Sequence, residues 1–179
     1  MEKRIEIRKK ICMLGAFGVG KTSLVRQFVF NKYEDKYLST IGVLISQKQL
    51  PPFRKSDSGR IEQLEFIIWD LANIEKYNKM TKNYFRGAAG AIAVCDLTRA
   101  HTFEEIDQLL NKFLEINPKS RIVLAGNKID LVDQQLIEME RFLHLSDSYQ
   151  TTYTLTSAKT GENVEQLFVC LGNELLKSE

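Results

Sequence analysis

The sequence predicts a doubly wound α/β domain with a mostly parallel six-stranded sheet and helices on both faces of that sheet. Short runs that are almost continuously apolar, as buried strands of a parallel sheet are, alternate with stripes of apolar residues at helical spacing. No repeat or low-complexity segment interrupts this alternation. A chain of 179 residues is long enough to bury a continuous core without disulfides or metal staples, so we expect one domain over residues 1–179.

The apolar runs predict strands at residues 11–14, 64–69, 91–95, 121–125 and 152–155. Helical stripes cover residues 24–29, 103–113 and 164–175. Residues 51–59 are rich in proline, glycine and polar side chains, which predicts a hairpin loop. That loop is either a tolerated insertion or a surface for a partner. Because ligands of such folds bind at the carboxyl ends of the strands, polar motifs that follow different strands should converge at one edge of the sheet.

Composition and charge argue against several classes of protein. The formal net charge of +2 gives no global reason to expect nucleic acid as a partner. Cys12, Cys95 and Cys170 lie in apolar runs without paired spacing, as reduced core cysteines of cytosolic proteins do. No run reaches the roughly 20 apolar residues of a membrane span, and neither end carries a lipidation motif. We therefore expect a cytoplasmic monomer with no encoded lipid anchor, associated with membranes only through partners or a missing tail.

A phosphate-binding loop is predicted at residues 15–22, which match the pattern G-x-x-x-x-G-K-[ST] between an apolar run and a helical stripe. The glycines let the backbone fold around phosphate oxygens, and the helix that begins near Lys21 adds the positive end of its dipole. Lys21 should bridge the terminal phosphates, and the Thr22 hydroxyl should ligate Mg²⁺. This loop alone does not separate ATP from GTP. The expected contacts in this region are Gly15, Phe17, Gly18, Val19, Gly20, Lys21, Thr22 and Ser23.

Two further motifs follow predicted strands and favour guanine as the base. They are Asn-Lys-Ile-Asp at residues 127–130 and Ser-Ala-Lys at residues 157–159. The carboxylate of Asp130 can accept hydrogen bonds from both N1–H and the exocyclic amine of guanine. It would meet the unprotonated N1 of adenine unfavourably. The pair of motifs therefore argues against a nucleotide kinase or another ATP-dependent P-loop enzyme.

With these motifs the sequence resembles the Ras superfamily of small GTPases, and its Rab branch especially, over about residues 8–177. Residues 39–43 (Ser-Thr-Ile-Gly-Val) are similar to the Rab switch I, residues 69–70 (Trp-Asp) to the start of switch II, and residues 84–88 to the stretch after it. The resemblance implies a small G domain of the P-loop NTPase fold that binds GTP or GDP with Mg²⁺. It also implies effector, exchange-factor or activating proteins that bind through the switch regions.

The resemblance implies roles for residues outside the phosphate loop as well. Thr40 would close on Mg²⁺ and the γ-phosphate, and Asp70 would hold the metal, so that Thr22, Thr40 and Asp70 are the expected metal ligands. Lys21 and Thr40 are the expected catalytic residues. Tyr33 falls where the family places an aromatic ring against guanine, unless it is an ordinary surface aromatic. The remaining expected base contacts are Asn127, Lys128, Asp130, Ser157, Ala158 and Lys159, and the Ala158 backbone N–H would face the guanine oxygen.

Switch II departs from the family pattern Asp-Thr-Ala-Gly-Gln, because residues 70–74 read Asp-Leu-Ala-Asn-Ile. Asn73 replaces the glycine whose N–H meets the γ-phosphate, although asparagine tolerates positive φ better than other non-glycine residues. Ile74 replaces the glutamine that orients the attacking water and has no hydrogen-bonding group. Phe17 adds bulk where many relatives carry glycine.

These departures predict a guanine-nucleotide switch with weak intrinsic GTP hydrolysis. Two alternatives stay open. The chain could be a pseudo-GTPase scaffold that holds nucleotide as a structural cofactor, or Ile74 could simply pack within a rearranged switch II.

Overall fold

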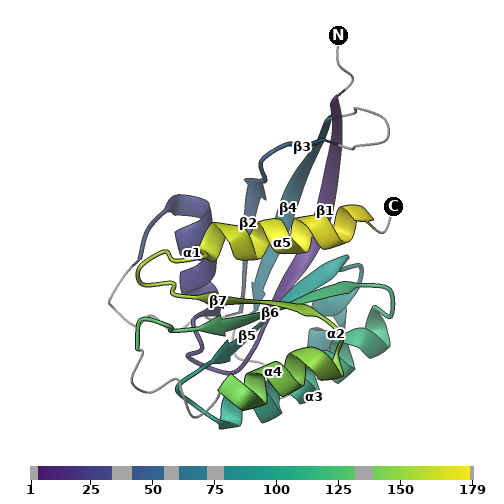
Figure 1. Cartoon of the computed structure of the whole chain (residues 1–179). Helices are drawn as coiled ribbons and strands as arrows, with labels where there is room; N and C mark the ends of the chain where they lie inside the picture. The colour runs from purple at the N-terminus through teal and green to yellow at the C-terminus, as the bar shows by residue number, and fades with distance from the viewer. Residues whose placement is uncertain (1–3, 34–41, 55–60, 72–78, 132–138, 178–179) are drawn as a thin grey trace.

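The computed structural model describes residues 4–33, 42–54, 61–71, 79–131 and 139–177, and in it one twisted sheet is covered by helices on both faces (Figure 1). Six strands form the continuous path of the sheet in the order β2-β4-β1-β5-β6-β7, and the two-residue β3 pairs with β4 outside this path. The strands are β1 (Arg4–Leu14), β2 (Val43–Gln49), β3 (Phe53–Arg54), β4 (Ile61–Leu71), β5 (Gly90–Asp96), β6 (Arg121–Asn127) and β7 (Thr152–Thr156). The predicted α/β fold with a six-stranded, mostly parallel sheet is confirmed.

Within the described residues, four helices connect strands and a fifth follows the last strand. They are α1 (Lys21–Phe30), α2 (Lys79–Phe85), α3 (His101–Ile116), α4 (Met139–Ser148) and α5 (Val164–Lys177). Helices α1 and α5 pack on one face of the sheet, and α2, α3 and α4 pack on the other (Figure 1). No helix in the described part of the chain combines the length and apolarity that a membrane span requires.

The pairing of the strands brings their carboxyl ends to one edge. Strand β1 pairs in parallel with β4 and β5, and β6 pairs in parallel with β5 and β7. Strand β2 alone on the continuous path runs antiparallel, against β4. The loops that follow β1, β5, β6 and β7 therefore all begin at the same side of the sheet.

The predicted hairpin loop at residues 51–59 is only partly a loop. Phe53 and Arg54 form β3, which extends the hairpin through antiparallel pairs with Glu62 and Ile61. The aromatic ring explains this difference, because Phe53 packs against the core under α5. Gly172 of α5 makes room for it, since a Cβ at Gly172 would lie 3.2 Å from the end of the Phe53 ring. The rest of the loop, residues 55–60, lies outside the described residues.

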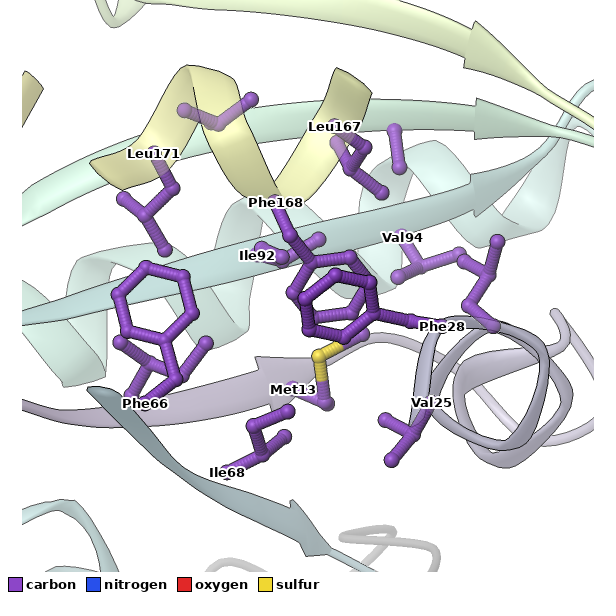
Figure 2. Packing of buried hydrophobic residues seen from close by; sticks show 14 of the residues in the cluster. Met13, Val25, Phe28, Phe66, Ile68, Ile92, Val94, Leu167, Phe168 and Leu171 are labelled. Carbon is purple, nitrogen blue, oxygen red and sulfur yellow. The ribbon is translucent and has the colours of Figure 1, made fainter. Parts of the chain in front are cut away.

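The core beneath α1 and α5 is centred on two stacked aromatic rings. Phe28 of α1 and Phe168 of α5 lie with their centroids 3.9 Å apart and their planes 4° from parallel. Figure 2 shows this pair above Met13 of β1, with Ile92 of β5 beside it. The stack fixes α1, and with it the phosphate loop that precedes α1, against the C-terminal helix.

We expect Phe168→Ala to lower the free energy of unfolding by about 3–5 kcal/mol, because the neighbouring side chains relax only partly and leave a cavity where the ring was. Urea denaturation at a fixed nucleotide concentration measures this change. Phe30→Ala is the matched control, since Phe30 lies on the same helix as Phe28 but is 60% exposed, and should change stability by less than about 0.5 kcal/mol. Equal losses for the two variants would contradict the assignment of the stack as the centre of this core.

Candidate functional site

Loops from three strands meet at the carboxyl edge of the sheet. The loop after β1 is joined to the end of β6 by a hydrogen bond of 2.8 Å from the Asn127 side-chain amide to the Val19 carbonyl. These residues stand 108 positions apart in the chain. A cavity of about 270 Å³ opens beside this contact, and it is lined by Gly20, Ser23, Tyr33, Asn127, Lys128, Asp130, Leu131, Ala158 and Lys159.

The backbone of the predicted phosphate loop approaches its neighbours too closely for any side chain at two positions. Gly15 has φ +142°, and a Cβ there would lie 2.4 Å from the Val94 carbonyl oxygen of β5. Gly20 has φ +102°, and a Cβ there would lie 2.3 Å from the Asn127 amide nitrogen. Only glycine fits these conformations without strain. The glycines therefore allow the loop to wrap tightly between β5 and β6.

Lys21, the first residue of α1, points back into this loop. Its ammonium donates hydrogen bonds to the carbonyl oxygens of Gly15 at 2.7 Å and Ala16 at 2.9 Å. Burial lowers the pKa of Lys21 to about 8, although the negative charges of Asp70 and Glu105 oppose this shift. A buried ammonium that donates to neutral carbonyl groups is well suited to bind a polyanion.

Thr22 and Asp70 form an oxygen-rich pair next to Lys21. The Thr22 hydroxyl donates to Asp70 Oδ2 at 2.6 Å. Burial raises the pKa of Asp70, and the Thr22 hydrogen bond and the charge of Lys21 act in the opposite direction. The other carboxylate oxygen, Oδ1, is buried and has no hydrogen-bond partner among the described residues. Such an oxygen fits a hard cation with oxygen ligands, such as Mg²⁺. Thr40, the third expected ligand, lies outside the described residues.

The predicted base loops are held together by their own side chains. Asn127 Oδ1 accepts hydrogen bonds from the Thr156 hydroxyl and from the Ala158 N–H, both at 3.2 Å. The Ala158 N–H, expected to face the guanine oxygen, thus donates to Asn127 in this structure. The Ser157 hydroxyl donates to Asp130 Oδ1 at 2.7 Å, which fixes the orientation of that carboxylate at the cavity wall.

The remaining predicted residues fall into two groups. Ser23, Tyr33 and Lys159 line the same cavity as Asp130, so the structure brings these four predicted residues together. Tyr33 is partly exposed there. Asn73 and Ile74, the two altered residues of switch II, lie outside the described residues.

Sequence reasoning did not identify Asp96, the last residue of β5, and Arg99, which lies just after β5 at the same edge. Asp96 Oδ2 lies 2.6 Å from the Lys128 ammonium and 2.7 Å from Arg99 Nε. Burial alone would raise the pKa of Asp96, but the hydrogen bonds from Lys128, Thr98 and Arg99 outweigh it and hold the pKa below its usual range. A second guanidinium nitrogen of Arg99 donates to the Phe17 carbonyl at 3.0 Å. The signal available in the sequence was an aspartate placed directly after a buried apolar run.

Comparison with known proteins identifies the family. The model of the Ras family matches residues 10–177. The Ras-related protein Rab-1 of Theileria annulata is 35% identical over 168 residues, which cover 93% of this chain and 73% of that protein. The GTP-binding protein ypt4 of Schizosaccharomyces pombe is 32% identical over 169 residues, covering 93% and 71% respectively. The human Ras-related protein Rab-27A is 34% identical over 177 residues, covering 94% and 78%. The chain therefore belongs to the Ras family, as a Rab-like GTP-binding small GTPase.

Proposed function

We propose that this Ras-family protein is a molecular switch that binds GTP with Mg²⁺ tightly and has slow intrinsic GTP hydrolysis. The observation that carries the proposal is the contrast between a connected set of predicted binding residues and an altered switch II. The phosphate loop and the predicted base loops are joined by the Asn127–Val19 hydrogen bond, which supports one connected site in which these residues would hold nucleotide. Ile74 stands where the family has its water-orienting glutamine.

The phosphates and the metal would be held at the start of α1. Lys21 would exchange its carbonyl partners for phosphate oxygens, whose negative charge suits a buried ammonium better. Thr22, Asp70 and Thr40 would hold Mg²⁺, which neutralises charge on the phosphates when it is bound. Oδ1 of Asp70 has no hydrogen-bond partner among the described residues, which supports this assignment because a buried carboxylate oxygen requires a partner.

The base would occupy the cavity between the loops after α1, β6 and β7. Asp130, oriented by Ser157, would accept the two guanine N–H groups. Tyr33 lines the cavity and would contact the ring of the base. Asn127 and Lys128 would support the wall of the pocket that they line.

Slow hydrolysis follows from the chemistry of phosphoryl transfer, which depends on positioning the water and stabilising the spread charge. An isoleucine side chain at position 74 cannot donate or accept a hydrogen bond for that water. Phe17 adds a large, 44% exposed side chain within the phosphate loop, where it would obstruct groups supplied in trans. The protein would therefore stay in its GTP form for longer than ordinary relatives do.

State-dependent partners would bind beside switch I. GTP would order Thr40 and the segment after Asp70, and GDP would release them. Strand β2 begins just after switch I at one edge of the sheet, and its Leu44 and Ile45 are exposed. A permanent, slowly exchanging nucleotide with no state-dependent partner would instead indicate a pseudo-GTPase scaffold.

Single-turnover hydrolysis of pre-bound GTP tests the slow-hydrolysis proposal. The wild-type rate should be roughly 10- to 100-fold below that of an ordinary Rab measured in parallel, because the water is not positioned. Ile74→Gln should raise the rate, whereas Ile74→Leu, which changes shape without adding a polar group, should not. A wild-type rate equal to that of the ordinary Rab would refute slow hydrolysis.

Asp130→Asn should shift base preference from guanine towards xanthine, since the amide offers a donor where the carboxylate accepted. Affinity for GTP should fall roughly 100-fold or more, because two hydrogen bonds to a charged group are lost. Competition of GTP and XTP against a fluorescent guanine nucleotide measures this shift. Asp147→Asn, an exposed change on α4, is the control. An unaltered preference for guanine would show that Asp130 does not contact the base.

Gly20→Ala tests whether the junction between the phosphate loop and the end of β6, made by the Asn127–Val19 hydrogen bond, supports nucleotide binding. Both Gly20 and Gly87 have positive φ, +102° and +72°, but only a Cβ at Gly20 would meet another residue, the Asn127 amide. Gly87→Ala should therefore cost about 1–2 kcal/mol in backbone strain alone. Gly20→Ala should lower the free energy of unfolding by more than this. It should also speed nucleotide dissociation, which stopped-flow release of a fluorescent nucleotide would measure. Equal release rates in the two variants would contradict the role of the junction.

A further inference from the structure

We propose that Arg99 is a positioning residue of the nucleotide site, which holds the Phe17–Gly18 peptide of the phosphate loop so that the Gly18 N–H faces the phosphates. This inference rests on the proposed nucleotide-binding function and adds a residue to it. Its basis is one contact between segments 82 residues apart, the 3.0 Å hydrogen bond from the Arg99 guanidinium to the Phe17 carbonyl.

The guanidinium is itself firmly anchored. Arg99 Nε lies 2.7 Å from Asp96 Oδ2, and Asp96 is 0% exposed. The other carboxylate oxygen, Oδ1, accepts from the Thr98 hydroxyl at 2.7 Å and from the Thr98 N–H at 3.0 Å. A charged pair supported by additional hydrogen bonds has a well-defined orientation. The second nitrogen of Arg99 therefore meets Phe17 with a fixed direction.

Because the peptide bond is planar, a hydrogen bond to the Phe17 carbonyl also orients the Gly18 N–H. In a trans peptide the carbonyl and the following N–H point in opposite directions, so a donor fixed on the Phe17 oxygen aims the Gly18 N–H away from Arg99. Phosphate loops bind anions through such N–H groups. A cationic donor on the carbonyl also polarises the peptide, which makes its N–H a stronger donor. Gly18 has φ +72°, a conformation that an external anchor helps to hold.

The same carboxylate connects the phosphate loop to the base loop. Lys128, which lines the predicted base cavity, lies 2.6 Å from Asp96 Oδ2, the oxygen that also receives Arg99. Asp96 thus fixes two cationic side chains, Arg99, which contacts the phosphate loop, and Lys128, which lies in the base loop. Because the Phe17 contact does not depend on a third phosphate, loss of Arg99 should affect GDP and GTP alike.

The test is dissociation of fluorescent GDP and of a fluorescent, non-hydrolysable GTP analogue from the full chain with Mg²⁺. Arg99→Gln should raise both dissociation rates roughly tenfold, the loss expected for one hydrogen bond from a charged group, and Arg99→Lys should restore part of the difference. Arg121→Gln, an exposed arginine at the far end of β6, should leave both rates unchanged. Non-hydrolysed nucleotides keep the result independent of the hydrolysis rate.

A spectroscopic measurement separates positioning from general stability. In the GDP complex the amide proton shift of Gly18 should move upfield in Arg99→Gln, because its peptide is less polarised, while melting temperature falls little. Unchanged dissociation rates in Arg99→Gln would overturn the inference. So would dissociation rates that rise equally in Arg99→Gln and Arg99→Lys, follow the fall in melting temperature and leave the Gly18 amide shift unchanged. A wild-type chain that binds no guanine nucleotide would instead overturn the proposed function, and this inference with it.

Discussion

The contact of the Asn127 side chain with the phosphate loop is the constraint on which the site depends. Asn127 ends β6. Its side-chain Nδ2 donates to the Val19 carbonyl, and its side-chain Oδ1 accepts from the Thr156 hydroxyl and the Ala158 N–H. One buried side chain therefore joins the loops after β1, β6 and β7. An amide is suited to this task because it donates and accepts at once. The close approach also requires the glycine at position 20, so the two motifs are physically coupled as well as adjacent.

Around this junction lie three buried charged side chains, Lys21, Asp70 and Asp96, which differ in their partners. The Lys21 ammonium donates to two carbonyl oxygens, whereas Asp96 accepts from both Lys128 and Arg99. The first arrangement is poorly compensated and ready for an anion, and the second is saturated and structural. Asp70 lies between these cases, with one oxygen bonded to Thr22 and the other without a partner in the described residues. The pattern separates the groups proposed to hold a ligand from the groups that hold the loops.

Much of the fold could be predicted because its signals are local. Buried parallel strands are continuously apolar, and the phosphate loop is a contiguous pattern with a strand before it and a helix after it. Contacts across strands could not be predicted in the same way. Asp96 meets Lys128 because it is the register partner of Asn127 in the β5–β6 pair, and no local pattern encodes that register. Strand β3 was missed because two prolines precede it and Phe53 is its only apolar residue.

The stacked rings of Phe28 and Phe168 have a thermodynamic consequence for ligand release. Helix α1 carries Lys21 at its beginning and Phe28 two turns later, so the phosphate end and the aromatic end belong to one rigid body. A ligand that binds only the folded chain stabilises it by mass action, and through this helix the stabilisation is shared with α5. Local opening of α5 and escape of the nucleotide should therefore be reciprocally linked, so that whatever loosens the C-terminal helix also shortens the lifetime of the bound state.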